Sequence, residues 1–160
     1  MPDLTFAELY AFGAQATISL LDRLEDAGRE VIERRPAPRI WSAEEYARHL
    51  AWLDDTMIRV ESLGLEPREF PEGFVVFPGQ VLETHLPLET TRAVTLDTQE
   101  NVGAALANLT PEAMADTVED AGGRTVARNL ARYLDRSAGA RASALLALRL
   151  VESSWKETLK

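Results

Sequence analysis

The chain has 160 residues, 46% of them hydrophobic and 27% charged, and its formal net charge is −9. A chain of this length can form one well-packed core but not two comfortable domains, so we expect a single domain over residues 1–160. The negative charge argues against binding to nucleic acid or to an anionic membrane surface, because both require clustered Lys and Arg.

Further classes of chemistry and location are excluded by what the sequence lacks. There is no cysteine, which rules out disulfides and thiolate sites and leaves His, Asp and Glu as candidate metal ligands. No apolar run reaches the roughly 20 residues of a membrane-spanning helix. Residues 1–4 lack the basic start and apolar stretch of a signal peptide. We therefore expect a cytoplasmic protein.

The first predicted helix extends from about Leu4 to Glu33. Its apolar and small residues recur at spacings of three and four, the period of an amphipathic helix; they are Phe6, Tyr10, Gly13, Thr17, Leu20, Leu24, Ala27 and Val31. Pro36 and Pro38 follow it, and proline cannot continue a helix.

The second predicted helix has the clearest start signal in the chain. Ser42 is its N-cap, and Glu45 three residues later completes a capping box. The apolar stripe that follows has the spacing of bundle helices and consists of Tyr46, Leu50, Leu53, Met57 and Val60. Asp54 and Asp55 point away from this stripe, so we expect both to be solvated.

Residues 63–88 contain too much proline and glycine for one helix, yet the apolar residues at 70 and 74–77 argue against a disordered linker. We expect this connection to lie across the bundle or to form part of a dimer contact. A third helix is predicted over residues 88–109, and a fourth from near Thr125 to about Val151. The pattern predicts an all-α, up-down four-helix bundle with a long connection between its second and third helices.

His49, one of only two histidines, lies at the edge of the second helix's stripe, one turn after Glu45 and beside Trp52. One interpretation is a metal ligand or general base facing the bundle. The other is a half-buried histidine hydrogen-bonded to Glu45 or to a backbone carbonyl. His85 has no neighbour at ligand spacing and is predicted to lie on the surface.

The apolar stripe of the last helix, which includes Tyr133, is interrupted by Ser137 and Arg141, one turn apart. An arginine that faces a bundle core is costly unless it is paired or solvated. Arg141 could bind an anion at the base of a polar pocket. Alternatively, it could reach out of its alanine-rich surroundings to water or to a carboxylate.

These features together resemble the DinB/YfiT-like superfamily of bacterial four-helix bundles. The specific motif is WSAEEYARHLAW at residues 41–52. The layout adds a long first helix, a proline-containing turn, a long second connection and a GGRT lead into the last helix at residues 122–125. The resemblance covers nearly the whole chain in layout and implies the fold of that family.

The resemblance also implies a zinc or nickel ion held by three histidines, one on the second helix and two on the last. In some family members this metal activates a low-molecular-weight thiol. His49 matches the first ligand position, but Ser137 and Arg141 stand where the paired histidines would, and no histidine follows His85. These departures predict no metal cofactor and weaken the case for the family's thiol chemistry; zinc or nickel at His49 is the alternative.

Three functional hypotheses follow. The first is a relative without a metal site that binds a small, anionic ligand in a polar pocket; the candidate residues are Glu45, His49, Trp52, Tyr133, Ser137 and Arg141. The second is a thiol-dependent transferase or hydrolase built on His49. The third is a structural or partner-binding protein with residues 70–77 as its contact. Analogy with the family also favours a homodimer.

Overall fold

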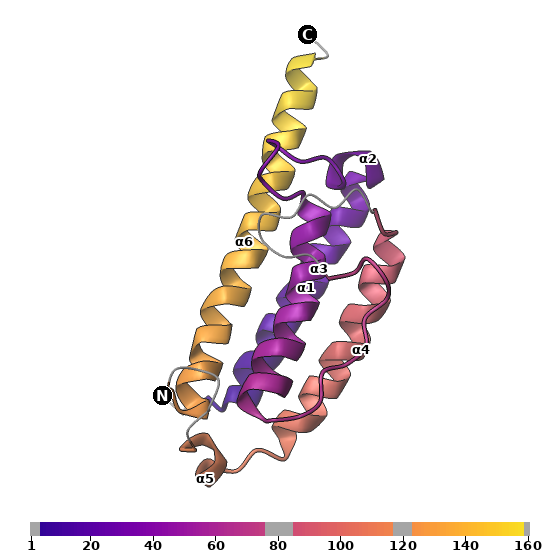
Figure 1. The fold of residues 1–160 in the computed structure, drawn as a ribbon. Helices are drawn as coiled ribbons and strands as arrows, with labels where there is room; N and C mark the ends of the chain where they lie inside the picture. Colours follow the sequence, from indigo (N-terminus) through magenta and orange to yellow (C-terminus); the bar gives the residue numbers. More distant parts are fainter. Residues whose placement is uncertain (1–3, 76–84, 117–122, 159–160) are drawn as a thin grey trace.

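The structure, a computed structural model, describes residues 4–75, 85–116 and 123–158. Within these ranges the regular structure is helical and no β-strand forms. The elements are α1 (Phe6–Ala27), α2 (Arg29–Ile32), α3 (Ala43–Leu53), the π-helix η1 (Asp54–Ser62), α4 (Leu88–Ala107), α5 (Pro111–Met114) and α6 (Val126–Thr158) (Figure 1). The fold is therefore all-α, as the sequence predicts.

The first helix is shorter than its sequence period suggests. Thr5 caps α1, and its hydroxyl accepts a hydrogen bond from the Glu8 amide in a capping box. The sequence predicts one helix to Glu33, but Gly28 has a φ of 92°, a conformation that L-residues with side chains rarely adopt. Gly28 therefore ends α1, and α2 starts as a separate turn.

The predicted capping box of the second helix is confirmed. The Ser42 hydroxyl accepts a hydrogen bond from the Glu45 amide at 3.2 Å, and the Glu45 carboxylate accepts one from the Ser42 amide at 3.1 Å. From Asp54 onward the regular α-helical hydrogen bonding gives way to the wider π-helix η1. Such segments are rare and occur frequently at functional sites.

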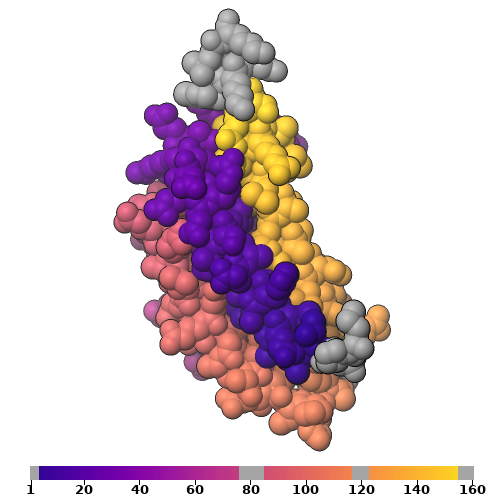
Figure 2. Space-filling view, turned by 180° about the vertical axis from the view of Figure 1, so that it is seen from behind, coloured from indigo at the N-terminus to yellow at the C-terminus, as the bar shows by residue number. Residues whose placement is uncertain are grey.

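The long helices α1, α3–η1, α4 and α6 lie side by side around an apolar interior (Figure 1). Seen from behind, α1 runs along the face of the molecule between α4 and α6 (Figure 2). One core cluster contains Leu53, Ile58, Val102 and Leu130, and another contains Leu24, Leu50, Ala144 and Leu148. The packing of these clusters fixes the positions of the helices, and therefore of any groove between them.

The helix directions correct the predicted up-down order. Glu44 at the start of α3 meets Thr91 at the start of α4, and Ile58 of η1 packs with Val102 farther along α4. These two helical segments therefore run parallel to each other, whereas a strict up-down order would make them antiparallel. The last helix is also longer than predicted, since α6 continues to Thr158 rather than to about Val151.

Residues 63–75 fold back onto α3 and α4. Phe74 is completely buried and stacks on Phe70 with ring centroids 5.4 Å apart. The guanidinium of Arg48 donates to the Gly73 carbonyl at 2.7 Å. The remaining apolar residues predicted as a contact, at positions 76 and 77, lie outside the described residues, as does residue 122 of the predicted GGRT lead.

Among the described helices, none has both the length and the hydrophobicity that a membrane span needs.

Candidate functional site

A groove of ≈ 370 Å³ opens between α3 and α6. Its two walls differ, since aromatic side chains predominate on one and small side chains on the other. It is lined by Arg39, Trp41, Tyr46, His49 and Leu53 on one side and by Arg136, Ala140 and Ser143 on the other. The small side chains of Ala140 and Ser143 leave space that larger residues of α6 would fill.

The aromatic wall is a continuous set of packed rings. The His49 imidazole stacks on Trp52, with centroids 5.3 Å apart, and meets Trp41 edge to face at 5.0 Å. Trp41 in turn contacts Tyr46 edge to face at 5.3 Å. Aromatic pairs of this geometry stabilise each other beyond the area that they bury. The wall is therefore preformed.

His49 is electrically neutral at pH 7. Burial, followed by the positive charge of Arg136, lowers its pKa from 6.5 to about 4. Its Nδ1 atom is buried and has no hydrogen-bond partner within the described structure. His49 is half-buried, as the simpler interpretation predicts, but its Nδ1 atom makes no hydrogen bond to Glu45 or to a described backbone carbonyl.

Glu45, the predicted neighbour of His49, is engaged elsewhere. Its two carboxylate oxygens accept hydrogen bonds from the Arg35 guanidinium at 2.8 and 2.6 Å. Burial alone would raise the pKa of Glu45, but the hydrogen bonds and charge of Arg35, together with Ser42, lower it. Glu45 therefore fixes the start of α3 rather than forming part of the groove.

Three other predicted site residues, Tyr133, Ser137 and Arg141, do not line this groove. Arg141 lies towards α1, where its guanidinium approaches the Thr17 hydroxyl at 3.5 Å and packs over Gly13. Ser137 is buried, and its hydroxyl donates to the Leu134 carbonyl. The groove thus brings His49 of α3 together with neither residue, because Ser137 bonds within its own helix and Arg141 lies against α1.

Tyr133 instead belongs to a buried polar cluster. The hydroxyls of Tyr10 and Tyr133 both donate to the carboxylate of Asp54, Tyr10 at 2.9 Å. Burial raises the pKa of Asp54 from 3.8 to about 6, although both tyrosine hydrogen bonds and the charge of Arg141 act in the opposite direction. Arg141 thus supplies partial charge balance to a buried carboxylate.

The prediction that Asp54 and Asp55 are solvated is wrong. Their exposed fractions are 6% and 1%. Asp55 is covered because the chain returns over it: the backbone amide of Arg68 donates to its carboxylate at 3.3 Å, and Arg59 pairs with it at 2.7 Å. No local sequence pattern predicts the contact between Asp55 and the Arg68 amide, because the two residues lie on either side of a loop.

The fold and the groove together define a class of all-α proteins. In this class a groove lies between the second and last long helices, and the WSAEEYARHLAW motif supplies one of its walls. A sequence model of the DinB superfamily matches residues 12–136. The chain belongs to the DinB superfamily. No curated protein and no solved structure matches the chain.

The residues of the groove do not fit a three-histidine metal site. His49 faces Arg136, Ala140 and Ser143, none of which is a metal ligand of that kind, and Arg136 places a permanent positive charge beside it. His85 is exposed. Among the described residues no group of three or more His, Cys, Asp or Glu is placed to hold an ion.

Proposed function

We propose that this chain is a four-helix-bundle member of the DinB superfamily that binds a small organic anion in the α3–α6 groove without a metal ion. The observation that carries the proposal is the pairing of two guanidinium groups, those of Arg39 and Arg136, with an aromatic wall. The site differs from the predicted one in its cation, because Arg136 rather than Arg141 lines the groove.

The lack of ion-pair partners for the two arginines among the described residues supports an anionic ligand. Both are exposed, and neither forms an ion pair with any described residue. The chain offers 26 acidic residues against 17 Lys and Arg, so carboxylates are abundant. Arginines elsewhere on the molecule do find them: Arg23, Arg29, Arg35, Arg59, Arg68 and Arg92 all form ion pairs.

The aromatic wall supports an apolar body on that anion. Trp41 and Tyr46 offer ring surfaces at the groove, and the neutral His49 adds an uncharged one. Pockets for organic ligands are typically apolar with a few placed polar groups. Trp52 supports His49 from behind through its stacked ring and does not line the groove itself.

The alternative of an enzyme that uses His49 as a general base is less well supported. A base works best when its pKa lies near the working pH. The pKa of His49, about 4, makes the imidazole a weak base at neutral pH. Ligand binding therefore remains the function that the groove favours.

The test measures the binding of benzoate and of its neutral analogue benzamide. Binding is detected by the changes that each compound causes in the NMR signals of the Trp41 indole. We expect saturable binding of benzoate and little binding of benzamide, because only the anion pairs with a guanidinium. Arg136→Ala should weaken benzoate binding by about tenfold, the equivalent of one charge-assisted hydrogen bond.

Arg149→Ala is the matched control, since it removes the same charge from an exposed position of α6 outside the groove. It should leave the benzoate affinity unchanged. Equal binding of benzoate and benzamide, or equal weakening by both variants, would contradict the proposal.

A further inference from the structure

The two arginines of the groove lie at opposite ends of it. Ala43 and Ala47 near the start of α3 pack with Ala144 and Leu148 of α6, whereas Leu53 packs with Tyr133, so α3 and α6 are antiparallel. Arg39 precedes α3 and therefore belongs to the Ser143 end of the groove. Arg136 belongs to the Leu53 end.

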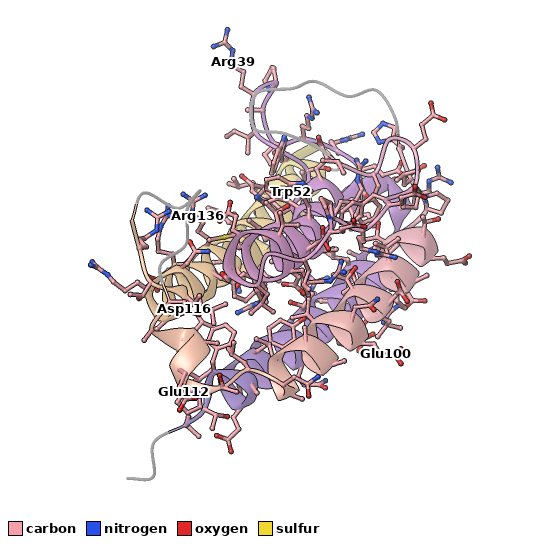
Figure 3. All side chains as sticks on the ribbon, turned by 60° about the horizontal axis from the view of Figure 1, so that its bottom comes forward. Arg39, Trp52, Glu100, Glu112, Asp116 and Arg136 are labelled. Carbon is pink, nitrogen blue, oxygen red and sulfur yellow. The ribbon has the colours of Figure 1, made fainter. Side chains whose placement is uncertain are left out.

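The separation follows from helix geometry. Arg136 and Ser143 are two turns apart on α6, which is about 10 Å along the axis. Figure 3 shows the two labelled arginines apart from each other, Arg136 on α6 and Arg39 on the segment before α3. The two guanidinium groups therefore come from opposite ends of the groove and can each pair with a separate acidic group.

The stretch between the arginines carries no charge. Its lining consists of the rings of Tyr46 and His49 opposite Ala140 and Ser143, and His49 is neutral. Within the described lining, Arg39 and Arg136 are thus the charged side chains, and an uncharged surface of aromatic and small side chains separates them. This distribution matches a ligand with charge at its two ends rather than at its centre.

We propose that the ligand is an elongated dianion with an apolar body and an acidic group at each end, bound across the groove by Arg39 at one end and Arg136 at the other. This inference rests on the proposed function, because it specifies the class of anion that the same groove binds. Guanidinium groups pair with carboxylates and phosphates alike, so the acidic groups are defined by charge and spacing. Once one end is bound, the second contact forms intramolecularly and adds affinity at little further entropic cost.

The test compares two probes of the same body, biphenyl monocarboxylate and biphenyl dicarboxylate with the acids at its two ends, at matched ionic strength. We expect the dicarboxylate to bind about fivefold tighter, which corresponds to one partly solvated ion pair. Terephthalate, which is too short to span the groove, should gain little over benzoate.

Arg39→Ala should remove the difference between the two biphenyl probes, because only the dicarboxylate gains from a second guanidinium. Arg39→Gln serves as a second variant, and Arg149→Ala is again the control. Equal affinities of the two biphenyl probes for the unmodified protein would overturn the dianion assignment. If Arg136→Ala still weakened both probes, the proposed anion site itself would stand. Failure of every anionic probe to bind would overturn both proposals.

Discussion

The ion pair between Glu44 and Arg48 is the most deeply buried charge pair of the described chain. Both side chains are 1% exposed, and Nε of Arg48 lies 2.9 Å from the Glu44 carboxylate. The Thr91 hydroxyl of α4 donates to Glu44, and Arg48 donates to the Gly73 carbonyl. Two charges thus join α3, α4 and the segment that folds back over them.

Loss of one partner should be far more costly than loss of an exposed pair. We expect Arg48→Ala to lower the free energy of unfolding by about 3–5 kcal/mol, because the buried Glu44 carboxylate would lose its counter-charge. Arg92→Ala, which removes a pair with the exposed Asp22 and Glu25, should cost less than about 1 kcal/mol. Urea denaturation of the two variants measures both, and similar losses would contradict this view of Arg48.

At the scale of the element, η1 depends on side chains from another helix. The Ser62 hydroxyl donates to the Met57 carbonyl at 2.5 Å, and the Asn129 amide of α6 donates to the same carbonyl and to the Ser62 hydroxyl. A wide helical turn leaves backbone groups that need such partners. Asn129 therefore holds the irregular turn against α6.

We expect Asn129→Ala to destabilise the protein by about 1–3 kcal/mol, since the buried Ser62 hydroxyl would lose its donor and the Met57 carbonyl one of its two donors. The matched control is Asn108→Ala, because the Asn108 amide is exposed and bonds only to a carbonyl of its own helix. Thermal unfolding compares the two. A loss confined to Asn108→Ala, or no loss in either variant, would show that Asn129 does not support η1.

At the scale of the whole molecule, two buried acids set an unusual pH dependence. Burial raises the pKa of Glu44 from 4.5 to about 7 and that of Asp54 from 3.8 to about 6. The folded chain therefore binds these protons more strongly than the unfolded chain does. For groups with raised pKa values, stability is gained as the pH falls through the folded-state pKa.

The free energy of unfolding should accordingly rise as the pH falls from about 8 to about 6.5. Below that range His49 opposes the trend, because its lowered pKa makes the folded chain the weaker proton binder. Urea denaturation across this interval measures the slope, and the combined variant Glu44→Gln with Asp54→Asn should flatten it. A stability that decreases with acidification over the same interval would contradict the assignment.

The homodimer expected by analogy remains a separate prediction, which sedimentation velocity tests.

Much of the fold follows from local pattern. The Ser42–Glu45 capping box, the long amphipathic stretches and the WSAEEYARHLAW motif were readable because caps and helical period depend on residues within a few turns. The same local signals placed His49 on the inner edge of its helix, and it does line the groove.

The all-α class, the helix starts and the family could all be predicted from local sequence patterns. The tertiary structure decided which face of α6 meets α3, and hence that Arg136 rather than Arg141 stands beside His49. It also decided that Asp54 and Asp55 are buried, because η1 departs from the α-helical period and residues 63–75 return over it. A one-residue difference in position on a helix turns a side chain by about 100°, so the rotation of α6 decides the site, and only packing sets that rotation.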